Sequence, residues 1–128
     1  MKFRRLLVAV TVLSTAAFAA DSPERYADAR ALWEKTKDRT EYQAYAVEFA
    51  QFNNHFHLDE KDGCYGRASG PVNLMLVISR RDGDDFASVA NVLPDVDNAK
   101  SQCFKRTYTG LRTKAPPFLP FVLQMSMG

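Results

Sequence analysis

The spacing of the apolar residues changes once along this chain, near residue 70. Over residues 26–33 and again over residues 42–56 they recur every three or four positions, which is the period of amphipathic helices. Beyond residue 70 they form short runs rich in β-branched residues, and turn sequences interrupt these runs, as is typical of strands. The chain is therefore expected to combine helices with a sheet.

Helix-start signals precede each expected helix. Ser22 followed by Pro23 predicts a helix over residues 23–37 that Ser22 caps. Thr40 and Gln43 form a capping box, which predicts a second helix ending near residue 55. Asp95 is expected to cap a third helix that ends near Gly110. Charged residues 58–63 predict a loop after the second helix.

The strand signals lie after the two first helices. Residues 72–79 and 86–93 predict a β-hairpin, and Asp82 with Gly83 suits the positive φ angles of a tight primed turn. Residues 114–120 are proline-rich and are expected to be extended. Apolar and other residues alternate over Phe121–Met127, which predicts a last strand with one buried face.

Taken in order, these elements indicate an α+β fold. Two N-terminal helices are followed by a β-hairpin, a helix and a β-strand, forming a small antiparallel sheet with helices packed on one face. Residues 20–128 are enough for a single domain, but its core will be modest in size.

Residues 1–19 have the pattern of a cleavable signal peptide. Lys2, Arg4 and Arg5 precede an apolar run over residues 6–12, and residues 17–19 supply the small side chains of a cleavage site. The apolar run is short for a span of about 30 Å, although an uncleaved anchor is the alternative interpretation. The mature protein is thus expected to be periplasmic or secreted.

Removal of this leader changes the charge balance. The leader holds three of the 17 Lys and Arg residues and none of the 15 Asp and Glu residues, so the remaining chain has 14 against 15, a net charge of −1. A nearly neutral surface gives no electrostatic reason to bind nucleic acid or anionic lipid. We therefore expect no nucleic-acid partner and no stable membrane anchor after cleavage.

The two cysteines, Cys64 and Cys103, are expected to form a disulfide. Export delivers them to an oxidising compartment, where paired thiols are normally oxidised. Two buried free thiols and a metal-binding pair are the alternatives. Because Cys64 precedes the first strand and Cys103 lies on the third helix, the bond would join helix to sheet.

Two short patterns suggest copper ligands. His55 with His57 and Met125 with Met127 are spaced two residues apart and offer imidazole and thioether ligands. The methionine pair fits equally well on the buried face of a strand, and the histidine pair fits a surface position. We therefore expect no metal site and no cofactor, with copper binding kept as an alternative.

Other catalytic or ion-binding patterns are weak. Asp59, Glu60 and Asp62 precede Gly63, but they lack the ligand spacing and closing glutamate of a calcium loop. No nucleophile motif of a hydrolase is present in the sequence. The chain is therefore expected not to be an enzyme.

The order of signals over residues 70–127 points to a known family. A strand over residues 72–79, a turn with Gly83, a second strand, a helix around Ala99, prolines at Pro116 and Pro117 and a closing strand follow one another. In this order and spacing the segment resembles the C-terminal domain of TonB-type energy transducers and their exported relatives. The resemblance covers a little under half of the chain.

That resemblance implies noncatalytic protein binding. Members of the family bind a transporter peptide by strand addition at a sheet edge. Transducers also keep a membrane helix and a long proline-rich linker, which we do not expect here, so an accessory role in the envelope is implied. A copper-binding protein and a secreted inhibitor remain alternatives. The equivalent edge here consists of Phe121, Val122, Leu123, Gln124, Met125, Ser126 and Met127.

Overall fold

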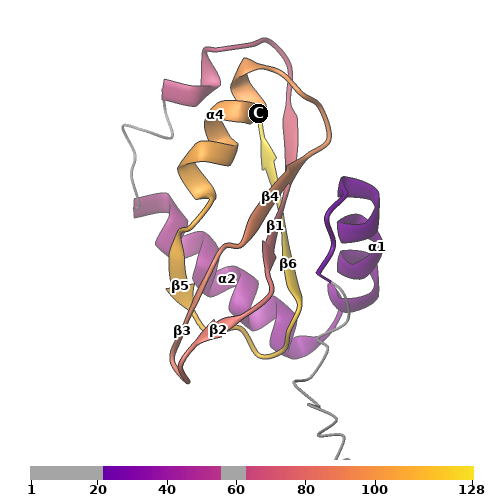
Figure 1. Ribbon diagram of the computed structural model, residues 1–128, viewed down its shortest axis with the longest axis vertical. Coiled ribbons are helices and arrows are strands. Elements are labelled where there is room, and N and C mark those ends of the chain that lie inside the picture. The colour runs from indigo at the N-terminus through magenta and orange to yellow at the C-terminus, as the bar shows by residue number, and fades with distance from the viewer. Residues whose placement is uncertain (1–21, 56–62) are drawn as a thin grey trace, which may run out of the picture.

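The computed structural model describes residues 22–55 and 63–128, and it confirms the α+β class (Figure 1). The predicted leader and the loop with its acidic cluster lie outside these residues, wholly or in large part. A turn of helix occupies residues 63–65. The other elements, in chain order, are α1 (Tyr26–Thr36), α2 (Thr40–His55), β1 (Val72–Ile78), β2 (Arg81–Asp82), β3 (Phe86–Ser88), β4 (Asn91–Pro94), α4 (Ala99–Tyr108), β5 (Arg112–Lys114) and β6 (Phe121–Met127).

The first two helices lie where the periodicity places them. α2 spans Thr40–His55, as predicted. α1 begins three residues later than expected, and the prediction that Ser22 caps it is wrong. The N-cap residue is Arg25, which is extended (φ −119°, ψ 147°) and makes no capping bond with its side chain. Pro23 is buried ahead of the helix and does not form its first turn.

The predicted hairpin forms one antiparallel ribbon, which contributes two strands to each of two sheets. At its base β1 pairs with β4, with Leu74 opposite Pro94. At its tip β2 pairs with β3 in the same register, with Asp82 opposite Phe86. The primed two-residue turn is a wrong prediction, because this register leaves three residues, 83–85, in the loop. Gly83 has the positive φ (81°) that the loop requires.

The two sheets each receive a third strand from the C-terminal part of the chain. β6 pairs with β1, which gives the order β4-β1-β6. β5 pairs with β3, which gives the order β2-β3-β5. The last strand is confirmed, whereas β5 was not predicted. Its three residues, Arg112–Lys114, overlap the start of the segment expected to be merely extended.

α4 begins at a different cap from the one predicted. Asn98 accepts a hydrogen bond from the Ser101 main-chain N–H at 2.9 Å, and the Ser101 hydroxyl accepts one from the Asn98 N–H at 2.9 Å. Asp95 accepts two hydrogen bonds from Asn73 instead, one of them from its main-chain N–H. Asp95 therefore joins the end of β4 to β1 and does not cap the helix.

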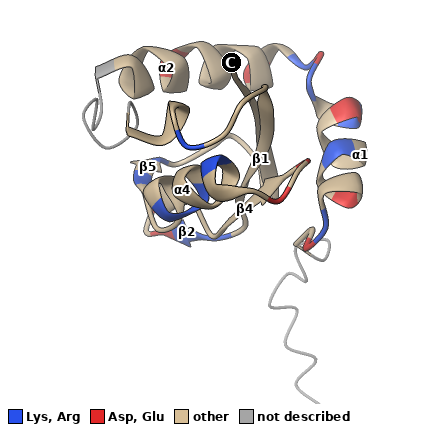
Figure 2. Cartoon of the chain, turned by 90° about the horizontal axis from the view of Figure 1, so that it is seen from above, with Lys and Arg blue, Asp and Glu red and all other residues tan. Residues whose placement is uncertain are grey.

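Helices cover both faces of the sheet β4-β1-β6. α2 and α4 lie on one face, whereas α1 lies on the other (Figures 1 and 2). The expected arrangement on one face therefore holds for α2 and α4 and must be corrected for α1. The apolar stripe of α1 packs on the second face, where the buried residues are Ala29, Met75, Val77, Leu93 and Val122.

Two-sided burial also changes the expectation for β6. Phe121, Val122 and Leu123 are all buried, so the strand does not have a single buried face over its whole length. The alternation reappears only beyond these residues, where Ser126 is exposed and Met127 is buried. The first half of β6 is therefore covered on both faces, whereas the second half is covered on one face only.

The disulfide between Cys64 and Cys103 is present. The sulfur atoms are 2.01 Å apart and the Cα atoms 5.4 Å apart. The bond joins the helical turn before β1 to α4, which is the predicted link between helix and sheet. Within the part of the chain that the structure describes, we found no helix with the length and apolar character needed to cross a membrane.

Candidate functional site

The outer edge of β6 is directed away from its sheet. Asn73 and Val77 of β1 accept main-chain hydrogen bonds from Asp95 and Ala90, on the β4 side. Because main-chain groups alternate in direction along a strand, the even-numbered residues of β1 bond to β6. In the observed register, the main-chain groups left pointing outward from β6 belong to Val122, Gln124 and Ser126.

α2 covers the first half of this edge. The Tyr42 hydroxyl donates a hydrogen bond to the Val122 carbonyl oxygen at 2.9 Å. The Tyr42 ring stacks on Phe121, with 4.8 Å between the ring centroids. Burial raises the pKa of Tyr42 to about 12, and a hydrogen bond from the Gln124 main chain to the hydroxyl opposes this shift. Tyr42 therefore covers the edge as far as the Gln124 N–H.

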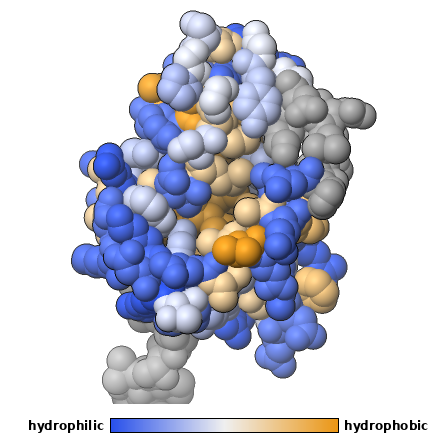
Figure 3. Space-filling model, turned by 180° about the vertical axis from the view of Figure 1, so that it is seen from behind, coloured by the Kyte–Doolittle hydropathy of each residue, from blue (hydrophilic) through white to orange (hydrophobic). Residues whose placement is uncertain are grey.

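Beyond Tyr42, the outward-pointing groups of this edge among the described residues are the Gln124 carbonyl and the main chain of Ser126. Ser126 is exposed, and its hydroxyl lies in a chain of side-chain hydrogen bonds from Gln124 through Ser126 to Asn73, each 2.9 Å long. None of these bonds uses the outward main-chain groups of Ser126 or the Gln124 carbonyl oxygen. Seen from behind (Figure 3), apolar side chains line a hollow between hydrophilic ones, in the region where β6 runs between α1 and α2.

The opposite edge of the same sheet is protected. Val92 of β4 directs its N–H outward, and the Asn91 side chain accepts a hydrogen bond from it at 3.0 Å. Pro94 has no N–H to offer. These are two devices by which sheet edges avoid pairing with another chain. The two edges of the sheet therefore differ, because the end of β6 lacks both of these devices among the described residues.

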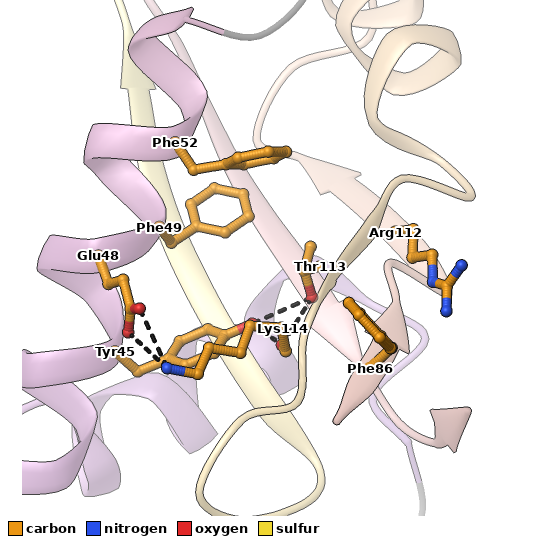
Figure 4. A pocket seen from close by; sticks show the side chains of 8 residues that line it. All are labelled: Tyr45, Glu48, Phe49, Phe52, Phe86, Arg112, Thr113 and Lys114. Carbon is orange, nitrogen blue, oxygen red and sulfur yellow. Dashed lines mark hydrogen bonds and ion pairs between the residues drawn. The ribbon is translucent and has the colours of Figure 1, made fainter. Parts of the chain in front are cut away.

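A groove lies between α2 and the second sheet. Its volume is about 320 Å³, at the low end of the range for ligand-binding clefts. Figure 4 shows that Phe49 and Phe52 extend from α2 toward β5, with Thr113 facing them. The lining residues come from three distant parts of the chain: Tyr45, Glu48, Phe49, Phe52, Phe86, Arg112, Thr113 and Lys114.

Specific contacts fix the closed end and the rim of this groove. The Tyr45 hydroxyl donates to the Lys114 carbonyl oxygen at 2.6 Å and lies 3.1 Å from the Thr113 hydroxyl. At the rim, the Lys114 ammonium is 3.1 Å from the Glu48 carboxylate. The Arg112 guanidinium lies 4.0 Å above the Phe86 ring.

The structure does not favour a copper site at the predicted methionines. Met127 is buried in the main core, and Met125 packs against that core, so their thioethers serve as packing groups. The His55 side chain and His57 lie outside the described residues. Among the residues that are described, no three His, Cys, Asp or Glu side chains are grouped as metal ligands.

Sequence reasoning missed the groove. The aromatic stripe of α2 was expected to pack on a sheet, and Tyr45 and Phe49 are indeed buried. Phe52 and Phe86 belong to the groove as well, yet each keeps 44% of its surface exposed. Phe52 belongs to the predicted stripe of residues 42–56, so the α2 wall of the groove was visible in the sequence, whereas the opposite strand β5 was not.

Comparison of the chain with protein-family models, with curated proteins and with solved structures gave no significant match. The structure does have the element order on which the resemblance to TonB-type transducers was based, from the hairpin through α4 and the prolines to β6. Membership of that family stays a prediction.

Proposed function

We propose that this protein is an exported, noncatalytic binding module of the cell envelope, periplasmic or secreted, which takes an extended segment of another envelope protein by strand addition at β6. The observation that carries the proposal is the outward direction of the Gln124 carbonyl and of the Ser126 main-chain groups on an edge strand. An extended peptide needs such a row of donors and acceptors to pair with.

The rest of the molecule is consistent with this role. The Cys64–Cys103 disulfide is of the kind that persists outside the cytosol. The edge is placed on a rigid support, because β6 pairs along its whole length with the central strand β1. A rigid edge loses little conformational freedom when a peptide pairs with it. The resemblance of residues 70–127 to the TonB C-terminal domain implies the same mode of binding.

The decisive variant is Ser126→Pro. Its proline removes an outward N–H without breaking a bond to β1, and edge strands tolerate proline at such positions. A photo-crosslinking residue placed at position 124 in the oxidised protein, in cells, should form adducts with a partner. We expect Ser126→Pro to abolish these adducts and Ser126→Ala to retain them, and mass spectrometry to place the cross-link in an extended segment of the partner.

Position 125 provides the control for direction, since its side chain packs against the core. The same crosslinker there should give few adducts. Circular dichroism must show that Ser126→Pro stays folded. Equal adducts from Ser126→Pro and from the unaltered edge would rule out strand addition at β6.

A further inference from the structure

The outer edge of β5 faces the groove. Leu111 and Ala115, on either side of this strand, are hydrogen-bonded through their main chain to the β3 side. By the alternation of main-chain groups, Arg112 and Lys114 therefore point away from β3. The Lys114 carbonyl already accepts a hydrogen bond from the Tyr45 hydroxyl. The next main-chain groups that point outward along this edge are the N–H and C=O of Arg112.

The two faces of a strand added beside Arg112 would meet different surfaces. A residue paired with Arg112 has its side chain on the same face as the Arg112 side chain, whereas its two neighbours point to the opposite face. That opposite face is the α2 side, where Tyr45, Phe49 and Phe52 form the apolar wall. The groove thus offers an apolar surface to alternate positions of a bound strand.

The charged side chains at the rim of the groove determine which residue of a bound strand fits between its two apolar residues. Lys114 and Glu48 neutralise each other at 3.1 Å. The Arg112 guanidinium lies over the Phe86 ring, and within the described ranges 22–55 and 63–128 no carboxylate is paired with it. A planar guanidinium supported on an aromatic ring is a strong partner for a carboxylate.

From these three observations we infer that the groove between α2 and β5 is a second binding site, distinct from the edge of β6. Its ligand is an extended peptide segment with an acidic residue between two apolar ones. The acidic residue pairs with Arg112 through both main chain and side chain, and the apolar neighbours enter the aromatic groove.

A labelled peptide tests this inference directly. The probe is acetyl-Ser-Thr-Phe-Glu-Phe-Thr-Ser-amide carrying a fluorescent dye, titrated with the oxidised full chain and followed by fluorescence anisotropy. We expect saturable binding that weakens about fivefold when glutamate is replaced by glutamine. Methylation of the glutamate main-chain nitrogen should weaken binding by at least as much, because it removes one hydrogen bond of the strand pair.

Variants of the protein locate the site. Arg112→Gln should bind the glutamate and glutamine peptides equally, and Phe86→Ala should reduce the preference for glutamate because the guanidinium loses its support. Both side chains are exposed, so neither variant should unfold the protein. Arg30→Gln removes an exposed arginine of α1, on the other side of the molecule, and should leave binding unchanged.

Three results would overturn the inference. One is the lack of saturable binding at millimolar protein. Another is binding that Ser126→Pro removes and Arg112→Gln does not affect, since this would move the peptide to β6. The third is concentration-dependent self-association that Arg112→Gln abolishes while no peptide binds, which would assign the groove to a second copy of the chain. Failure of the β6 proposal alone would leave the Arg112 dependence intact.

Discussion

Buried tyrosines join distant parts of this protein through their hydroxyl groups. Tyr42 donates to β6 and Tyr45 to β5, while the Tyr108 hydroxyl of α4 donates to the Asn53 side chain of α2 at 2.7 Å. Each ring contributes apolar area to the core while its hydroxyl finds a partner, which avoids the free-energy cost of an unpaired buried polar group. Burial raises the pKa of Tyr108 to about 12, as it does for Tyr42.

These raised pKa values predict a loss of stability in alkali. A tyrosine in the unfolded chain loses its proton near pH 10, whereas the folded protein keeps Tyr42 and Tyr108 protonated to about pH 12. The free energy of unfolding should therefore not depend on these groups below pH 10 and should fall above it, by about 1.4 kcal/mol per pH unit for each tyrosine. Urea unfolding from pH 8 to pH 11 measures the slope.

Tyr108→Phe serves as the comparison. It should be less stable at pH 8, because the hydrogen bond from Tyr108 to Asn53 is lost, but its stability should fall less steeply above pH 10. If both proteins had the same slope over this range, titration of Tyr108 would not contribute to the pH dependence.

Single residues also show what the sequence could not indicate. Lys100 is only 2% exposed, and its ammonium donates hydrogen bonds to the main-chain oxygens of Gly70 at 2.7 Å and Gly128 at 2.9 Å. Lysine is normally a surface residue. Its position could be predicted only by knowing that α4 lies beside both the entry to β1 and the end of β6.

At the scale of the elements, local signals were reliable where they stood alone. The stripe and start signal of α2 predicted its bounds, and the alternation over Phe121–Met127 predicted β6. The cap of α4 was different, because Asp95 and Asn98 are both good cap residues and lie three positions apart. Asp95 is occupied by Asn73 of β1, a contact between segments 22 residues apart in sequence, so tertiary structure decided between them.

The capping assignment leads to a test at this scale. Asn98→Ala removes the side chain that accepts from Ser101, and we expect it to lower the free energy of unfolding by about 1 kcal/mol. Asn54→Ala, at an exposed position within α2, should leave it unchanged or raise it slightly, because alanine has the higher helix propensity. Chemical denaturation of the two variants measures the difference, and equal effects would contradict a capping role for Asn98.

β5 and the groove beside it could not be predicted for a related reason. A strand of three residues has almost no period of its own. β5 is defined by its pairing with β3, which lies some 25 positions earlier in the sequence. The groove then depends on where α2 crosses that pair, so aromatic residues such as Phe52 were visible in the sequence while the surface they form was not.

At the scale of the whole molecule, the sheet β4-β1-β6 separates two apolar clusters. The larger contains the disulfide and the contacts of α2 and α4, and the smaller holds α1. The sequence predicted an apolar stripe on α1 but placed it on the same face as the other helices, because the stripe fits either side of a sheet whose central strand is apolar on both. Cys64 and Cys103 were paired correctly from their number and expected compartment, without knowledge of the geometry.

Reduction of the disulfide tests how much the whole fold depends on it. The bond closes a loop with a sequence separation of 39, and removing it should lower the free energy of unfolding by about 4 kcal/mol in the chain-entropy model. Urea unfolding with and without reductant should show this difference. A variant with both Cys64→Ser and Cys103→Ser should resemble the reduced protein and be insensitive to reductant, and coincident curves for the oxidised and reduced protein would contradict the prediction.

The exposed tip of the hairpin, residues 83–85, lies within the loop that the disulfide closes. A protease that nicks the chain at this tip would therefore produce two fragments that remain one covalent molecule until a reductant separates them. In the oxidised protein, cleavage at this exposed turn would leave both halves tethered and able to stay assembled.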